Sequence, residues 1–262
     1  MPDETNEPVV LQAVDGPVAT ITLNRPGARN AISVELLDGL RAAMAAADAD
    51  ESVEAVVLTG TDPAFCAGVD LKQIGDKASG LFDTIFEDAH SPWPPISKPV
   101  IAAVNGPAIT GGLELVLNCD IVICSERARF ADTHARVGVL PGWGLTVLLP
   151  LAVGRSRARQ MSLTGDLLTA AQAHEAGLVT EVLPHAQLLA RATEIASSIA
   201  NNNARAVRAL LSSYRAVESE FVAGGYDVEG RTARVWGESD LDLAESGRRR
   251  AALMERARSQ TS

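Results

Sequence analysis

The alternation of apolar and polar residues predicts a β-hairpin at the start of the chain. VVLQAV (9–14) and PVATITLN (17–24) carry β-branched residues at alternating places on either side of a turn at Asp15-Gly16, which is the pattern of two paired strands. Three later runs are almost wholly apolar, as is typical of strands buried on both faces. These runs are EAVVLTG (54–60), KPVIAAVNG (98–106) and IVICSE (121–126).

Helices are predicted between these strands. From Ser33 the chain has a helical N-cap followed by apolar residues at helical spacing up to residue 50. ITGGLELVLNCD (109–120) is predicted to be a turn that enters a helix. Residues 72–98 mix charge, aromatics and prolines, and we interpret them as a helix followed by a loop that covers a site. Strand–helix–strand repetition of this kind favours a layered α/β core with parallel strands.

The last third of the chain is predicted to be mostly helical. A polar break at Asn201-Asn202-Asn203 divides it, so we expect a core over residues 1–200 and a helical C-terminal region over residues 201–262. The elements expected before the break are two helices (156–165 and 169–179), a short strand (179–184) and a helix from Gln187.

Composition and charge narrow the classes of partner. The chain has 262 residues, 47% of them hydrophobic, and a formal net charge of −10, which argues against nucleic acid or an anionic membrane surface as the main partner. Three cysteines in or beside apolar segments and an acidic, polar start favour a cytoplasmic protein with reduced thiols. The sequence has no apolar run as long as a membrane span and no cluster with metal-ligand spacing, so no metal is expected.

Three short stretches place backbone groups or charge where packing alone does not require them. The first, residues 64–70, follows a buried strand with small residues and a glycine, which lets another molecule approach the main chain; a tight turn also explains it. The second is the pair Gly111-Gly112, which opens a helix and presents free N–H groups to a developing negative charge. The third is the turn-rich stretch 130–144.

Two side chains in these stretches are candidates for acid–base chemistry. Glu114 stands in the first turn of an otherwise apolar helix, where a carboxylate is expensive to bury unless it is used or paired. The alternative is that it only complements the helix dipole or closes a capping box. His134 is a candidate because the ordinary pKa of histidine lies close to neutrality, although a lone histidine is often structural.

Together these stretches resemble the crotonase (enoyl-CoA hydratase/isomerase) superfamily, in family order over roughly residues 9–185. The resemblance implies an α/β fold, a crotonase-like superhelix of repeated ββα units, with a C-terminal helical region that covers the site and takes part in oligomerisation. It also implies a homotrimer, or a hexamer built as a dimer of trimers. The matching motifs are ITLNRPGARNAIS, VVLTGTDPAFCAGVDLK, KPVIAAVNGPAITGGLELVLNCDIVICSERARF, VGVLPGWG and LTGDLLTAAQAHEAGLVTEVLP.

The resemblance also implies an active site. The main-chain N–H groups of Val69 and Gly111 would form an oxyanion hole for the carbonyl oxygen of an acyl-coenzyme A thioester. Family hydratases hold a water between two glutamates. The first corresponds to Glu114. The second lies four residues after the position of Phe130, where this chain has His134 instead.

This substitution divides the functional hypotheses. In the first, the protein is an enoyl-CoA hydratase in which Glu114 activates water for attack at C3 and His134 delivers a proton to C2, with its pKa raised by the carboxylate. In the second, the pair carries out another reaction of the same enolate: double-bond isomerisation, decarboxylation or thioester hydrolysis. In the third, the protein binds acyl-CoA without turning it over. Asp132 is a candidate to orient the imidazole, but we interpret it as an ordinary loop acid.

Contacts to the substrate follow from the same motifs. Coenzyme A belongs to the substrate, so no separate cofactor is expected. Relatives often carry a lysine where this chain has Gly27, and Arg25 or Arg29 could compensate. Trp143 and Leu145 replace smaller residues and favour a reshaped acyl pocket. A nucleotide-binding α/β enzyme is disfavoured, because no phosphate-loop glycine pattern follows the first strand. The substrate-binding residues implied are Ala28, Arg29, Ala67, Asp70, Lys72 and Trp143.

Overall fold

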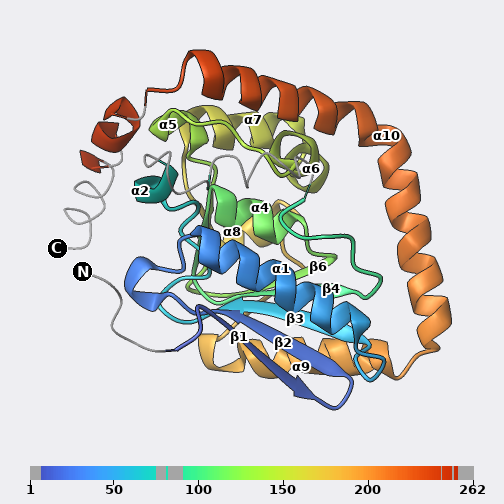
Figure 1. The fold of residues 1–262 in the computed structure, drawn as a ribbon. Coiled ribbons are helices and arrows are strands. Elements are labelled where there is room, and N and C mark those ends of the chain that lie inside the picture. The colour runs from blue at the N-terminus through green and yellow to red at the C-terminus, as the bar shows by residue number, and fades with distance from the viewer. Residues whose placement is uncertain (1–6, 75–80, 82–90, 243, 250, 253–262) are drawn as a thin grey trace.

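The computed structural model describes residues 7–74, 81, 91–242, 244–249 and 251–252. Over these residues it has a six-stranded sheet in the order β1-β2-β3-β4-β6-β9 and a three-stranded sheet in the order β5-β7-β8 (Figure 1). In the larger sheet β1 and β2 pair antiparallel, and each further pair of neighbours is parallel. The strands are β1 (Val10–Asp15), β2 (Val18–Leu23), β3 (Ala55–Gly60), β4 (Val100–Val104), β5 (Pro107–Ile109), β6 (Ile121–Ser125), β7 (Arg129–Ala131), β8 (Leu168–Thr169) and β9 (Glu181–Leu183).

Helices cover both faces of the larger sheet. The shorter ones are η1 (Pro26–Ala28), α2 (Leu71–Ile74), α4 (Gly111–Leu117), α5 (His134–Val137), α8 (Ala170–Glu175) and η3 (His185–Gln187). The longer ones are α1 (Val34–Ala49), α6 (Leu145–Val153), α7 (Arg155–Thr164), α9 (Leu188–Ala200) and α10 (Ala204–Ser239).

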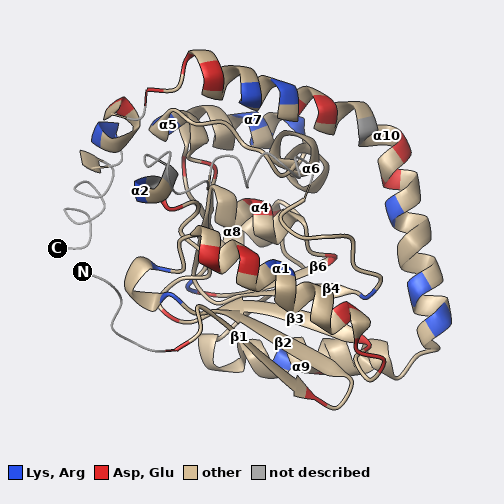
Figure 2. Cartoon of the chain, in the orientation of Figure 1, with Lys and Arg blue, Asp and Glu red and all other residues tan. Residues whose placement is uncertain are grey.

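The core is built from alternate residues of the parallel strands. Val56 and Leu58 of β3 belong to the cluster that includes the buried face of α1, whereas Val57 of β3 and Ile101 of β4 pack with α9 on the other face. Figure 1 shows α1 and α9 on opposite sides of the sheet. This two-sided burial explains why the central strands are apolar throughout. Figure 2 shows the charged residues mainly on the helices, while β2, β3 and β4 carry none.

The main predictions from the hydrophobic pattern are confirmed. The hairpin forms between β1 and β2, with Val10 opposite Leu23. Ser33 is the N-cap of α1, and its side chain accepts the N–H of Leu36 at 3.1 Å. The parallel α/β core and the helical C-terminal region are also present. Within the helix and loop predicted over 72–98, residues 75–80 and 82–90 lie outside the described residues.

Two features were missed by the sequence interpretation. The smaller sheet has strands of three residues or fewer, which are too short to show a periodicity. Helix α6 reads LTVLLPLAV, with Pro150 inside the helix. Because its residues are almost all apolar, it has no polar face to reveal a helical period, and the proline argues against a helix.

The C-terminal region begins where the polar break was predicted. Asn203 is the N-cap of α10, and its side chain accepts the N–H of Ala206 at 3.0 Å. From the end of α9, α10 arches around the molecule and passes along the outer side of α6 and α7 (Figure 1). The division into a core and a separate C-terminal unit at residue 200 stays a prediction. Within the described part of the chain, no helix is long and apolar enough to cross a bilayer.

Candidate active site

The start of α4 lies against the segment that follows β3. A Cβ on Gly112 would overlap the carbonyl oxygen of Cys66, and a Cβ on Gly111 would come within 3.2 Å of Val69 Cγ2 and 3.5 Å of the Val69 nitrogen. Position 112 therefore requires glycine, and position 111 leaves little room for a side chain. This close approach brings the N–H groups of Val69 and Gly111 close together. Neither donates to an acceptor among the residues that the structure describes, as an oxyanion hole requires.

Asn30 holds the Val69 side of this arrangement in place. Its side chain is fully buried and donates from Nδ2 to the carbonyl oxygens of Ala64 at 2.8 Å and Phe65 at 3.2 Å, while Oδ1 accepts the N–H of Arg25 at 2.8 Å. Asn30 has a φ of 55°, a conformation that asparagine tolerates better than most residues. Sequence reasoning did not single it out, although an asparagine that follows a Pro-Gly strand break signals such a turn.

Glu114 is 2% exposed, and its carboxylate binds main-chain groups outside its own helix. Its Oε1 accepts the N–H of Trp143 at 2.7 Å and the N–H of Gly142 at 3.1 Å. The N-cap of α4, Thr110, has no side-chain capping bond, so the capping-box interpretation is wrong. Oε2 lies 3.5 Å from Nε2 of His134. The carboxylate is therefore buried, paired and oriented by two main-chain donors.

His134 is 4% exposed and lies between two carboxylates. Its Nδ1 is 2.6 Å from Oδ1 of Asp132, and its Nε2 faces Glu114. Burial favours the neutral imidazole, but the hydrogen bonds and charges of Asp132 and Glu114 outweigh it and raise the pKa of His134 from 6.5 to about 9. His134 is consequently an imidazolium at neutral pH.

Asp132 is not an ordinary loop acid, as the sequence had suggested. It is 3% exposed, and its Oδ1 accepts from both Nδ1 and the main-chain N–H of His134. Burial raises the pKa of its carboxyl, but hydrogen bonds from His134 and from Ser162 of α7, together with the charge of His134, lower it below the usual value. Asp132 therefore fixes the orientation of the imidazole and keeps Nδ1 protonated.

The two loops expected to contact coenzyme A are joined. The N–H of Ala67 donates to the carbonyl of Arg29 at 3.0 Å. Arg29 is exposed and follows Ala28 at the end of η1 with a φ of 53°. Lys72 is exposed on α2. These expected contact residues thus lie on connected segments, and two exposed cations are among them.

Asp70 and Arg25 form an ion pair within the protein. Asp70 Oδ2 lies 3.4 Å from the Arg25 guanidinium, which also donates to the carbonyl of Ala31 at 2.5 Å. Asp70 Oδ1 accepts the N–H of Lys72 at 3.1 Å. The ion pair ties the loop before α1 to the segment after β3, so Arg29 rather than Arg25 is left to compensate for the missing lysine.

Trp143 and Leu145 are buried, on the segment that donates to Glu114 and at the start of α6. Each is 1% exposed. The main chain of Trp143 donates to Glu114, and its carbonyl accepts from Asn118 Nδ2 at 2.9 Å. The residues predicted to reshape the pocket are therefore buried, and the main chain of one of them holds the candidate catalytic carboxylate.

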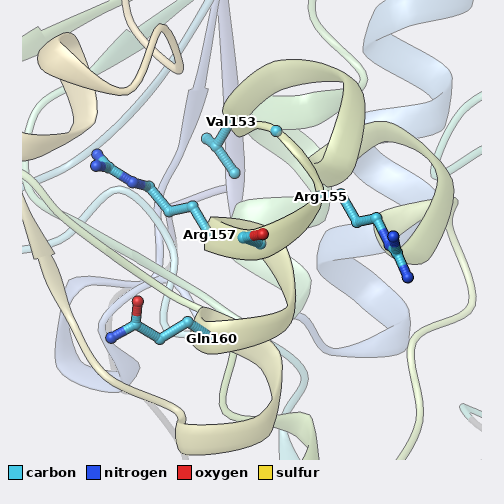
Figure 3. Close-up of a pocket in the computed structure, with 6 residues that line it drawn as sticks. Val153, Arg155, Arg157 and Gln160 are labelled. Carbon is cyan, nitrogen blue, oxygen red and sulfur yellow. The ribbon is translucent and has the colours of Figure 1, made fainter.

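A hollow of about 480 Å³ lies elsewhere, at the junction of α6 and α7. Figure 3 shows that the side chains of Arg155 and Arg157, which line it, point away from each other. They do not converge on one ligand position, and neither Glu114 nor His134 lines this hollow.

The fold and the site define a class of protein: an α/β protein with a buried carboxylate–imidazolium pair. The carboxylate lies on α4, whose first residue supplies one of two main-chain N–H groups that have no acceptor among the described residues, and the imidazolium opens α5. The family model "Enoyl-CoA hydratase/isomerase" matches residues 14–231. The chain belongs to this family, the crotonase superfamily, so the resemblance found in its motifs is confirmed.

Individual relatives agree with this membership. The chain is 40% identical over 194 residues to "Probable enoyl-CoA hydratase 1, peroxisomal" of Arabidopsis thaliana, covering 74% of this chain and 73% of the relative. It is 40% identical over 195 residues to 2,3-dehydroadipyl-CoA hydratase of Escherichia coli (strain K12), covering 73% and 76%. The crystal structure of an enoyl-CoA hydratase from Mycobacterium avium superposes with a TM-score of 0.81 at 52% identity, covering 88% of this chain and 98% of the other.

Proposed function

We propose that this protein adds water across the C2=C3 bond of a 2-enoyl-CoA thioester. The observation that carries the proposal is the buried contact of 3.5 Å between Glu114 Oε2 on α4 and His134 Nε2 at the start of α5, next to two main-chain N–H groups. Hydration needs a base for the water, an acid for C2 and a place for the negative charge that develops between the two steps. The site offers one group for each task.

The N–H groups of Val69 and Gly111 hold the thioester oxygen. When water attacks C3, the electron pair of the double bond moves through C2 to the carbonyl oxygen and forms an enolate. Two main-chain donors fixed at this oxygen stabilise the enolate more than the substrate, and the loss of one such donor typically costs about 100- to 1000-fold in rate. Asn30 keeps one of the two donors in position through the hydrogen bonds described above.

Glu114 and His134 divide the proton transfers. Glu114 takes a proton from water as the water oxygen bonds to C3, and the imidazolium of His134 gives its Nε2 proton to C2 as the enolate collapses. The protein is then left with a neutral imidazole and a protonated carboxyl. A proton transfer from Glu114 to His134, across their contact, restores the starting state.

The site carries a net charge of −1 in its resting state, because Glu114 and Asp132 are anionic and His134 is cationic. The site therefore keeps one carboxylate to accept a proton and one acid to donate it, with Asp132 holding the acid in its protonated form.

We place the coenzyme A part of the substrate on the joined loops. Arg29 and Lys72 supply exposed cations for the phosphates, and the small residues Ala28 and Ala67 leave the main chain accessible. Trp143 would shape the acyl end of the pocket. Asp70 would not contact coenzyme A itself but would hold the two loops together through its ion pair with Arg25.

We also propose that the protein assembles as a homotrimer or as a dimer of such trimers. Large apolar side chains on α10 are exposed in the single chain, among them Leu210, Tyr214, Val217 and Phe221. Such residues are usually covered by a partner surface. The mass measured by light scattering should be three or six times that of the chain, and a monomer would contradict the proposal.

The test is the loss of conjugated enoyl-thioester absorbance with crotonyl-CoA and with a longer 2-enoyl-CoA. Wild type should consume both, Glu114→Gln should keep only a small residual activity, and His134→Ala should be slower by about 100-fold or more. His174→Ala, at an exposed histidine, is the matched control and should keep full activity. Tight binding of acyl-CoA without loss of absorbance would reject the hydratase and leave a binding protein or another reaction.

A second candidate is another reaction of the same enolate, and His134 at the position of the second glutamate is the observation that favours it. Mass analysis of the products separates the possibilities. Hydration adds one water to the substrate, isomerisation leaves the mass unchanged, decarboxylation removes carbon dioxide, and hydrolysis releases free coenzyme A.

A further inference from the structure

One buried carboxylate of α10 has no part in the chemistry above. Glu229 is 5% exposed. Its Oε1 accepts the N–H of Gly144 at 2.5 Å, its Oε2 accepts the N–H of Thr146 at 2.6 Å, and the Thr146 hydroxyl also donates to Oε2. These groups belong to the first turn of α6, whose N-cap is Gly144 and has no side-chain capping bond. Glu229 therefore caps α6 from a distant helix.

Glu114 binds the same turn. The N–H groups of Gly142 and Trp143 donate to its Oε1, so successive main-chain donors of one short segment are divided between two carboxylates. We call residues 141–146 the carboxylate turn. Glu229 accepts from the later part of this turn and Glu114 from the earlier part, so the turn connects the two carboxylates.

Close packing fixes the place of α10 over the carboxylate turn. A Cβ on Gly144, whose φ is 86°, would overlap the ring of Tyr226, and a Cβ on Gly225 would come within 3.0 Å of Val147 Cγ2. Tyr226 and Glu229 are three residues apart and so share one side of the helix. In Figure 1 α10 passes along the outer side of α6. Glu229 thus reaches the turn from a helix that is closely packed against it.

The charge of Glu114 reaches Glu229. Burial raises the pKa of the Glu229 carboxyl, the hydrogen bonds from Thr146 and Gly144 oppose this, and the negative charge of Glu114 raises it further. This effect agrees with two carboxylates attached to opposite parts of one short turn.

We propose that Glu229 is a positioning residue for Glu114. By fixing the carboxylate turn, it keeps the N–H groups that bind Oε1 of Glu114 in place, and it thereby leaves Oε2 facing His134. The inference rests on the proposed hydratase function and adds that the C-terminal helix sets the geometry of the catalytic carboxylate.

The kinetic test compares Glu229→Gln with wild type. The amide nitrogen of glutamine cannot accept a hydrogen bond, so one side of the turn loses its acceptor. Since a displacement of about 1 Å at a reacting group can cost about 100-fold, kcat should fall by roughly 10- to 100-fold. KM should stay within about twofold, because the loops expected to hold coenzyme A do not contact Glu229. Glu220→Gln, at an exposed glutamate of the same helix, should match wild type.

A double variant separates positioning from general damage. If Glu229 acts through Glu114, then Glu229→Gln should lower the residual activity of a Glu114→Gln variant much less than it lowers wild-type activity. An equal loss in both backgrounds, or an unchanged kcat for Glu229→Gln, would overturn the inference.

Hydrogen exchange gives a readout that does not depend on activity. The amides of Gly142 and Trp143 should exchange faster in Glu229→Gln than in wild type, and their exchange rates should be unchanged in Glu220→Gln. Equal exchange rates in the two variants and wild type would overturn the inference. If Glu229→Gln does not fold, Thr146→Val removes the hydroxyl donor alone and should show the same acceleration to a smaller extent, and its absence overturns the inference. An inactive wild type would reject the proposed function, while the exchange rates still decide the role of Glu229 in the turn.

Discussion

Replacing Asp132 with asparagine tests whether its neighbours set the charge of His134. The pKa of His134 is raised from 6.5 to about 9, and since one pKa unit corresponds to about 1.4 kcal/mol, the surroundings favour the imidazolium by about 3 kcal/mol. Burial works against the charged form, so Asp132 and Glu114 together contribute more than this amount. Asparagine keeps the size of the side chain and an acceptor for Nδ1–H but removes the charge.

Without the charge of Asp132, the pKa of His134 should fall by at least about 1 unit, because the effect of burial is then opposed by the charge of Glu114 alone. The alkaline limb of the pH profile of kcat should move down by the same amount. The assay is the enoyl-thioester absorbance between about pH 6 and pH 10, with an NMR titration of the His134 imidazole beside it.

Asp166→Asn is the matched control, since Asp166 is exposed and pairs with Arg136 on the surface; it should leave the profile unchanged. The reasoning would be refuted by an alkaline limb that stays near its wild-type position in Asp132→Asn. It would also be refuted by a neutral His134 in wild type at pH 7.

Three further predictions concern stability. Wild type should lose about 3 kcal/mol of unfolding free energy between pH 6.5 and pH 9, because His134 binds its proton more tightly in the folded protein than in the unfolded chain. Urea unfolding at both pH values measures this loss, which should be smaller in His134→Gln. Asn30→Ala should cost about 3 kcal/mol, since it leaves two buried carbonyl groups without this donor and puts alanine at a φ of 55°; a cost below about 1 kcal/mol would contradict this. Gly112→Ala should lower the midpoint of thermal unfolding and the yield of soluble protein because its Cβ meets the Cys66 carbonyl, whereas Gly247→Ala, with nothing within 4 Å, should not.

Local pattern was enough to predict most of the secondary structure. Period-two alternation predicted β1 and β2, and a hydroxyl N-cap followed by helical spacing predicted α1, because these signals come from residues that are neighbours in the chain. The apolar runs of β3, β4 and β6 indicated strands covered on both faces. Where the local signal was absent, as in the uniformly apolar α6 with its internal proline, the prediction failed.

The order and spacing of motifs also determined the family and pointed to Glu114 and His134. The sequence could not reveal the state of these groups, because a pKa depends on burial and on the distance to other charges. Asp132 looks like a loop acid until α5 and α7 enclose it, and its contact with His134 then makes the imidazole cationic.

The tertiary structure alone decided which distant residues support the site. Glu229 is 85 residues from Gly144 along the chain, and nothing in its local sequence distinguishes it from the other acids of α10. Asp70, expected to meet the substrate, is turned inward by Arg25. In both cases the physical reason is the same. A buried carboxylate is stable only when it is hydrogen-bonded or paired with a cation, and only the folded chain determines which donors lie within hydrogen-bond distance.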